Sequence, residues 1–283
     1  MAGLWNLEPL EFAVDALRDA GDMFDLGAAV YHAADVCYHA GEIDEAFGRA
    51  RAQNAATARI EPEAPPSVRG TWAVEALCTA LRGQLDDRKF DEVYQVGLAM
   101  GDVVVSTAVL FDWGEMLVRY GRVEEAIELM ERGYRMWKEE RLLDPYSSSV
   151  LYRLPMGYLE LPTLDPGRAR LLRRVQVAAL RKTRRMHRHW RSPVLANQAR
   201  LLERAGKFAE ADARFREAVE VAHRQNAGFF VSTGLYEWGL VLLDRGESSA
   251  AFERLQESLE IAREGGNVWL ENRCREALER RSR

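Results

Sequence analysis

The sequence predicts an all-α fold in which helical hairpins stack into an α-solenoid. A short pattern returns five times: a helix ends at a turn, usually with glycine, and an amphipathic helix with a small or apolar residue near its start follows. Apolar residues recur at three- and four-residue steps, and strand-type alternation is missing. Because one hairpin can bury its apolar face only against a neighbour, such repeats decide the fold. The five copies read Gly41-Glu-Ile-Asp-Glu-Ala46, Arg88-Lys-Phe-Asp-Glu-Val93, Gly121-Arg-Val-Glu-Glu-Ala126, Gly206-Lys-Phe-Ala-Glu-Ala211 and Gly246-Glu-Ser-Ser-Ala-Ala251.

The first predicted element is a lone amphipathic helix over residues 8–20, which Gly21 would end. It has the pattern of the second helix of a hairpin, so we expect a partial N-terminal repeat. Such a helix would either cap the array or mark a former junction with an upstream domain.

About six hairpins are predicted over residues 27–264, with turns 33 to 47 residues apart. Proline-rich and serine-rich connections at 61–66 and 142–149 account for part of this variation, because solenoids tolerate insertions between helices. A final amphipathic helix over 267–283 suits a terminal cap, so residues 1–283 are predicted to form one domain. The expected turns lie at Gly41, Arg88, Gly121, Pro166, Gly206 and Gly246.

Apolar stripes support the hairpin register. In the stretch from 208 to 222 the spacing of three and four residues predicts one buried helix face. Small residues next to the turns, such as Ala126 and Ala211, would let paired helices approach closely. The predicted stripe comprises Phe208, Ala211, Phe215, Ala218, Val219 and Ala222.

The repeats resemble the tetratricopeptide family, whose pattern runs Trp-x2-Leu-Gly-x2-Tyr, then Ala-x3-Phe, then Pro. Two segments match this order: Trp113-Gly114 with Leu117, Gly121, Ala126 and Met130, and Trp238-Gly239 with Leu242, Gly246, Ala251 and Leu255. Trp stands beside Gly where the family usually has Leu, the closing Pro is mostly absent, and the period is near 40 residues. The chain is similar to longer-period arrays of bacterial signalling ATPases and transcriptional activators. The resemblance implies a right-handed solenoid and brings no catalytic residues.

Composition indicates a soluble, folded chain: 47% of residues are apolar, 29% are charged and the net charge is −5. The N-terminus shows no signal-peptide pattern, and no apolar stretch is long enough for a membrane span. The three cysteines are far apart within helical patterns, so we expect buried free thiols. These features predict a cytoplasmic protein and leave a homodimer open.

Catalytic and metal-binding motifs are missing. The sequence has no nucleophile elbow, phosphate-binding loop or zinc-protease motif. His32, Asp35 and His39 share one helix side, but a metal site would need further ligands from another helix. Structural histidines are the favoured interpretation, and the sequence predicts no metal, no cofactor and no enzymatic activity.

The first helix of each hairpin lines the concave face in tetratricopeptide arrays, so the resemblance implies a binding groove there. Arginines and aromatic residues together are typical of interaction hot spots. The alternative is that solvated concave positions are polar anyway. The predicted groove residues are Tyr31, Asp35, Tyr38, Arg82, Phe111, Glu115, Arg119, Arg153, Arg200 and Tyr236.

A basic strip is the clearest charge feature. Residues 166–202 hold eleven Lys or Arg and no Asp or Glu, so this segment carries +11 and the remainder −16. Clustered Arg suits carboxylates and phosphates, which indicates an acidic protein or, less favoured by the acidic net charge and sparse aromatics, nucleic acid. The alternative is neutralisation by neighbouring glutamates such as Glu124, Glu125, Glu128 and Glu131. The strip comprises Arg173, Arg174, Arg181, Lys182, Arg184, Arg185, Arg188 and Arg191.

The sequence therefore predicts a non-enzymatic scaffold that binds a peptide or protein, with an acidic partner favoured, in its concave groove. The first alternative is a sensor or regulatory module of a bacterial signalling ATPase or transcription regulator. The second is nucleic-acid binding through the basic strip at 168–191. The sequence does not name the partner.

Overall fold

Helix ends in the structure coincide with the glycine turns of the sequence. The computed structural model describes residues 7–21, 23–60, 66–142 and 149–280, and all regular elements within these ranges are helical. The glycines at positions 41, 121, 206 and 246 each follow a helix end within two residues and have φ between 71° and 90°. A left-handed residue there lets its amide bond back to the last helical turn, as Gly41 does to the Tyr38 carbonyl at 3.1 Å.

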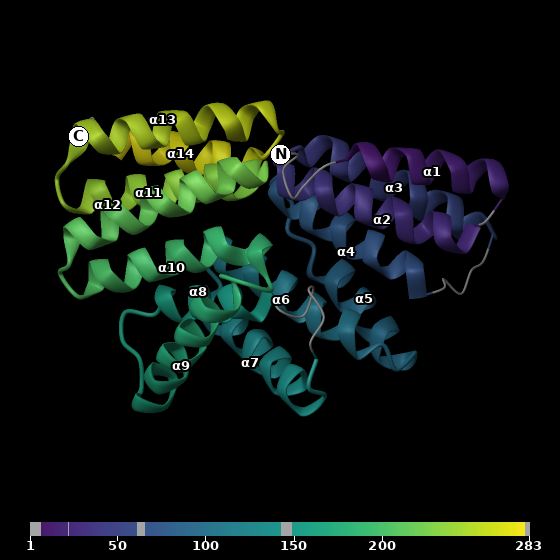
Figure 1. The fold of residues 1–283 in the computed structure, drawn as a ribbon, viewed down its shortest axis with the longest axis horizontal. Coiled ribbons are helices and arrows are strands. Elements are labelled where there is room, and N and C mark those ends of the chain that lie inside the picture. Colours follow the sequence, from purple (N-terminus) through teal and green to yellow (C-terminus); the bar gives the residue numbers. More distant parts are fainter. Residues whose placement is uncertain (1–6, 22, 61–65, 143–148, 281–283) are drawn as a thin grey trace.

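Fourteen α-helices and one 3-10 turn make up the described chain (Figure 1). Helix α1 coincides with the expected lone helix, and α14 lies within the expected terminal cap. The connections at 61–65 and 143–148, and residues 281–283 of the expected cap, lie outside the described residues. In chain order the elements are α1 Glu8–Ala20, α2 Met23–Ala40, α3 Ile43–Ile60, α4 Pro66–Leu81, α5 Asp87–Ala99, α6 Val103–Arg119, α7 Val123–Glu139, α8 Val150–Glu160, α9 Pro166–Lys182, η2 Arg188–Trp190, α10 Arg191–Arg204, α11 Phe208–Gln225, α12 Gly228–Asp244, α13 Ser248–Glu264 and α14 Val268–Arg280.

The two Trp-Gly dipeptides make the same contacts in different hairpins. Trp113 donates from Nε1 to Asp87 Oδ1 at 2.7 Å, and its ring stacks on Phe90 with centroids 6.1 Å apart. Trp238 repeats both contacts, with Asp212 Oδ1 at 3.0 Å and Phe215 at 6.1 Å. These tryptophans are therefore structural, because each ties its helix to the outer helix of the preceding hairpin.

The glycine beside each tryptophan permits close packing with the following helix. A Cβ on Gly239 would lie 2.7 Å from Leu255 Cγ, and one on Gly114 would lie 2.8 Å from Met130 Cγ. Neither position has room for a methyl group, so the inner helix approaches its outer partner more closely than any side chain would allow.

Helices form two layers. The even-numbered helices α2 to α14 contact one another in succession, and α12 also contacts α2 while α14 contacts α4. These contacts close the inner helices into a ring, in which the first and last hairpins meet at their ends (Figure 1). The odd-numbered helices pack outside them against their sequence neighbours. The inner faces of the even-numbered helices are therefore directed towards the centre of the ring.

The ring closes through backbone contacts at glycines. Ile43 N donates to the Gly265 carbonyl at 2.7 Å. A Cβ on Gly265 would lie 1.8 Å from Gly41 O, and one on Gly228 would lie 2.2 Å from Ala40 O. The turn after α2 is thus pressed against the start of α12 and the end of α13.

The expected stripe from 208 to 222 is buried except at its first residue. Phe208 is 50% exposed and lies under the Arg245 guanidinium, 4.8 Å from the ring centroid. Phe208 is the first residue of α11, where the helix meets the exposed turn at Gly206 and Lys207, which explains the difference. None of the described helices has the length and apolar character needed to cross a membrane.

Candidate functional site

A buried ion-pair network lies at the centre of the ring, and five predicted groove residues are part of it or border it. Glu115 in α6 is fully buried and accepts from Arg119 Nη2 at 2.7 Å and from Arg153 Nε at 2.6 Å. Tyr152 OH donates to the same carboxylate at 3.1 Å. The Tyr38 ring packs on Phe229, and the charges of Glu115 and Arg153 act on its buried hydroxyl.

Electrostatics keep this network ionised. Burial alone would raise the pKa of Glu115, but the charges and hydrogen bonds of Arg153 and Arg119 lower it to about 2. Burial lowers the pKa of Arg153, and the neighbouring Asp112 and Glu115 more than offset that effect. A carboxylate held between two guanidinium groups cannot be removed without leaving buried charge uncompensated.

Asp112 completes the network on the side of α2. Its Oδ1 lies 2.7 Å from Arg153 Nη2, yet burial raises the pKa of Asp112 to about 6. Asp35 and His39 of α2 lie close by, with His39 Nδ1 3.3 Å from Asp35 Oδ1. Among the described residues, no group of three or more His, Cys, Asp or Glu side chains is arranged to hold a metal ion.

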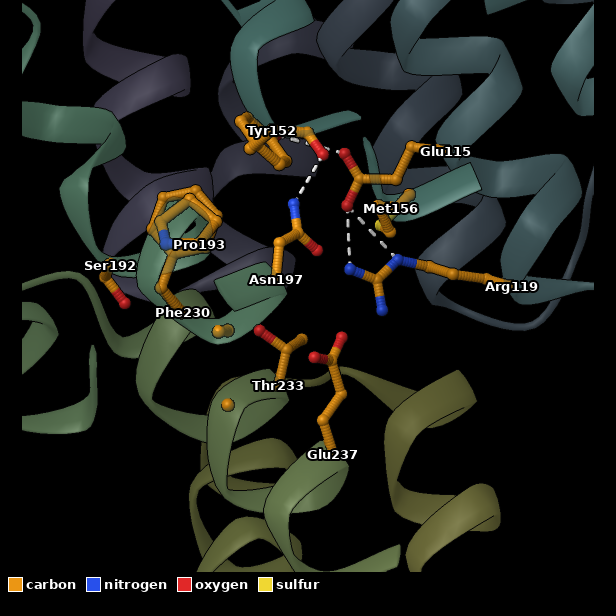
Figure 2. A pocket seen from close by; sticks show the side chains of 12 residues that line it. Glu115, Arg119, Tyr152, Met156, Ser192, Pro193, Asn197, Phe230, Thr233 and Glu237 are labelled. Carbon is orange, nitrogen blue, oxygen red and sulfur yellow. Dashed lines mark hydrogen bonds and ion pairs between the residues drawn. The ribbon is translucent and has the colours of Figure 1, made fainter. Parts of the chain in front are cut away.

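A pocket adjoins the network on the side of α12. Its lining includes Glu115 and Arg119 from α6, Asn197 from α10, and Thr233 and Glu237 from α12. Figure 2 shows Thr233 and Glu237 below the Arg119 guanidinium, and Asn197 beside it with its amide nitrogen directed to the Tyr152 oxygen. The pocket is therefore polar on one side, and Phe230 and Met156 form its apolar walls.

This pocket opens into a cavity of about 270 Å³, because Arg119, Met156 and Glu237 line both. The cavity is bounded by α6, α8, α10, α12 and α14. Two predicted groove residues, Arg200 and Tyr236, lie in its wall beside Trp269. Arg119 spans the site, since its guanidinium lies 5.2 Å from the ring centroids of both Phe229 and Trp269.

The pocket's guanidinium groups are already engaged. Arg119 pairs with Glu115, and Arg200 donates to Glu160 Oε1 at 2.7 Å and to the Leu159 carbonyl at 3.2 Å. By contrast, Glu237 makes no hydrogen bond or ion pair with any residue the structure describes. Burial raises the pKa of Glu237, although the positive charges of Arg200 and Arg119 act to lower it.

The other predicted groove residues lie elsewhere. Phe111 faces the outer layer, because its ring packs against Gly133 of α7 and is fully buried. Arg82 pairs with Asp44 near the surface, and its guanidinium covers Phe47 at 4.7 Å. Tyr31 is partly buried beside His32, with ring centroids 5.1 Å apart. A one-residue shift of register on a helix rotates a side chain by about 100°, which is enough to turn Phe111 to the opposite layer.

The basic strip lies on the outside of the molecule, on α9, η2 and the start of α10. Two of its members have internal partners: Arg191 donates to Leu180 O and Glu217, and Lys182 lies over Trp137 at 5.2 Å. Arg174 lies 3.5 Å from Tyr134 OH. Just outside the strip, Arg168 pairs with Glu131. The exposed arginines of the strip with neither an ion pair nor a side-chain hydrogen bond to a described residue are Arg173, Arg181, Arg184, Arg185 and Arg188.

Sequence reasoning missed Asp112, Asn197, Thr233, Glu237 and Trp269. One signal points to Glu237: it is an isolated carboxylate in the middle of the otherwise uncharged and mostly apolar run Gly228–Leu243. Charged side chains are rarely placed on such helices without a partner or a function. Asn197 and Trp269 carry no comparable signal, because their role depends on which helices meet across the ring.

Comparison with known proteins adds no assignment: no family model matches the chain, and no curated protein matches it either.

Proposed function

We propose that this chain is a non-enzymatic ligand-binding module in which a right-handed solenoid of tetratricopeptide-like hairpins closes around a central pocket. The observation that carries the proposal is the cavity of about 270 Å³ where five inner helices meet, lined by charged and aromatic side chains. Sites for small molecules are typically concave, with apolar walls and a few directed polar groups. This corresponds to the sensor alternative drawn from the sequence.

An extended groove for a long peptide receives less support. Helices α2 and α12 are in contact, and the inner residues Tyr38, Glu115 and Arg153 are at most 4% exposed. A cavity of this volume lies just below the usual range for drug-sized ligands, roughly 300–1,000 Å³. The space therefore suits a small molecule or a single side chain of a partner.

A regulatory role is consistent with where the pocket lies. Its walls come from α6, α8, α10, α12 and α14, and α12 and α14 also make the contacts that close the ring. A ligand that touches these helices together would stabilise the closed arrangement relative to any open one. Occupancy of the pocket would thus be transmitted to the surface where the first and last hairpins meet.

The test is a thermal-shift screen of the intact chain against small amines, amino acids, carboxylates, sugars and nucleotides, with hits confirmed by calorimetry. Leu240 lines the cavity, so Leu240→Trp should fill it and abolish the shift. The matched control is Leu98→Trp on α5, where the side chain is 43% exposed. The proposal fails if no compound binds, or if Leu240→Trp leaves binding intact.

A second candidate function is docking of an acidic protein on the basic strip. The observation that favours it is a surface hollow of about 510 Å³ lined by Arg181, Arg184 and Arg185. All three are exposed and unpaired within the described chain. Clustered arginines steer acidic partners, and that attraction weakens with salt.

Charge reversal tests this second function. The triple variant Arg181→Glu, Arg184→Glu and Arg185→Glu should retain its thermal stability, because none of the three makes an internal ion pair. In a pull-down eluted with rising salt, the variant should no longer capture the proteins that the wild type releases between low and moderate salt. Recovery of nucleic acid in that fraction would favour the nucleic-acid alternative, and unchanged capture would exclude the strip as a docking site.

A further inference from the structure

We propose that the central pocket binds a small organic cation, such as an amine or a quaternary ammonium compound. The inference rests on the proposed ligand-binding function and specifies the ligand's chemistry.

The charge balance of the pocket is the first argument. Its lining contains four carboxylates, namely Glu115, Glu160, Glu237 and Asp244, against three guanidinium groups, namely Arg119, Arg200 and Arg273. The formal charge is therefore −1, and a monocation would balance it. Partly desolvated charge is unfavourable unless it is paired, so an occupant of positive charge is favoured over a neutral or anionic one.

The unused hydrogen-bonding groups point the same way. Glu115 and Glu160 occupy Arg119 and Arg200, whereas the Glu237 carboxylate makes no hydrogen bond or close ion pair in the described structure and feels the two guanidinium charges only at longer range. Asn197 donates from Nδ2 to Tyr152 O at 2.7 Å, and its Oδ1 accepts from none of the described residues. Thr233 donates to Phe229 O at 2.8 Å, which leaves its oxygen free to accept. The pocket thus offers acceptors, and the complementary ligand is a donor.

Aromatic walls add a second form of cation recognition. Trp269 and Tyr236 line the cavity with their ring centroids 6.3 Å apart in an edge-to-face arrangement. Trp269 already receives the Arg119 guanidinium at 5.2 Å. Aromatic faces beside carboxylates are the usual means of binding ammonium groups.

The ends of three helices also favour a cation. Helix α6 ends at Arg119, α8 at Glu160 and α12 at Asp244, and all three residues line the cavity. The C-terminal end of a helix carries partial negative charge from its unpaired carbonyls. Arg119 at the end of α6 pairs with Glu115, and Arg200 donates to Glu160 and to the Leu159 carbonyl at the end of α8. Asp244 at the end of α12 makes no ion pair with a described residue and adds negative charge to the cavity wall.

Calorimetry with a matched set of probes tests the inference on the intact chain. The cationic probes are the monocations choline and butylamine, the neutral probe is the uncharged carbon isostere of choline, and the anionic probe is glutarate. Choline or butylamine should bind, while the isostere and glutarate should bind at least about tenfold more weakly, because they do not pair with Glu237.

The deciding variant is Glu237→Gln, which should weaken cation binding roughly ten- to a hundredfold. Its folding should be little affected, because Glu237 makes no hydrogen bond or close ion pair that the substitution would remove, and burial of its charge is itself unfavourable. The control is Glu220→Gln on α11, a carboxylate 57% exposed and loosely paired with Arg224 at 3.8 Å. This control should leave binding unchanged.

Proton release gives a second readout. Burial raises the pKa of Glu237, and the negative charges of Glu160 and Glu115 raise it further. The positive charges of Arg200 and Arg119 lower it, but by less. A bound cation stabilises the ionised carboxylate, so binding near the pKa should release protons, detected as a buffer-dependent heat. This release should vanish in Glu237→Gln.

The outcomes separate the two proposals. Tighter binding of glutarate or of the isostere, unaffected by Glu237→Gln but blocked by Leu240→Trp, would overturn the cation inference and leave the pocket as a ligand site. Absence of binding by every probe, together with an empty thermal-shift screen, would overturn both.

Discussion

The amide of Ile43 donates a hydrogen bond to the carbonyl of Gly265 at 2.7 Å, and this bond joins the first hairpin to the end of the last. Residues separated by most of the chain thus share a backbone contact of the kind normally found within one turn. The contact is direct because Gly265 has no side chain to hold the two turns apart. It is the closure that converts an arrangement of hairpins into a ring with an interior.

We first predict that Gly265→Ala weakens this closure. A Cβ at Gly265 would lie 1.8 Å from Gly41 O. The φ of −86° at Gly265 is accessible to any residue, so the substitution introduces a steric clash without backbone strain. The expected loss is about 1–3 kcal/mol of unfolding free energy. Differential scanning calorimetry should show a lower Tm, and small-angle scattering a larger radius of gyration.

The control for this variant is Gly48→Ala in α3, where a new Cβ meets no atom within 4 Å. Because alanine favours helix more than glycine does, this change should stabilise the protein by about 0.5–1 kcal/mol. Equal Tm values for both variants would show that the Gly265 contact contributes nothing.

Second, we expect Glu115→Ala to be among the most damaging single substitutions. It would leave two buried guanidinium groups, those of Arg119 and Arg153, without their shared carboxylate. Breaking a buried pair in this way costs about 3–5 kcal/mol, measurable by urea denaturation. In comparison, Glu125→Ala breaks an exposed, solvent-screened pair with Arg122 and should cost far less. Similar losses in the two variants would contradict the buried network.

Third, Asp112 should make stability depend on pH. Burial raises the pKa of Asp112 to about 6 in the folded state, above the usual value of 3.8. A raised folded-state pKa means that the folded protein binds the proton more tightly, so this contribution is fully present below pH 3.8 and is lost as pH rises through about 6. Its size is on the order of 3 kcal/mol.

The measurement compares the wild type with Asp112→Asn in urea denaturation between pH 4 and pH 7. The wild type should gain stability relative to the variant as the pH falls through this window. Taking the difference removes the pH dependence that the two proteins share, which leaves the contribution of Asp112. A difference that is constant with pH would refute the raised pKa.

Fourth, Trp113→Phe and Trp238→Phe should lose equal stability. Each substitution removes one indole hydrogen bond to an aspartate and keeps the stacking on a phenylalanine, so each should cost about 1 kcal/mol. Trp137 is the matched control, because its buried Nε1 has no hydrogen-bond partner within the described structure. Trp137→Phe should therefore cost less than either; an equal cost in all three would show that ring size alone matters.

Local features of the structure were open to prediction from the sequence. The hairpin turns at Gly121, Gly206 and Gly246 and the small residue that follows each depend on neighbours within one or two helical turns. The equivalence of Trp113 and Trp238 could be inferred from their shared place in the repeat. The turns and the equivalence of the two tryptophans therefore follow from the spacing of residues along the sequence.

The candidate site was only partly predictable. Glu115, Arg119 and Arg153 were expected on the inner faces and do meet at the centre, whereas Phe111 faces the outer layer. Glu237 could have been noticed as a lone charge in an apolar helix. Its proximity to Arg119 could not, because that depends on how α12 is placed relative to α6 after several intervening hairpins.

By itself, the sequence determined the helices, their turns and their pairing, because apolar spacing and glycine placement act over a few residues. Tertiary structure alone decided that the inner faces close on one another, bury a charge network and leave a cavity beside Glu237. The physical reason is that each hairpin is rotated slightly relative to the one before it, and closure depends on the total of these rotations. A change in any one rotation moves the last hairpin relative to the first, and no local pattern of residues encodes the total.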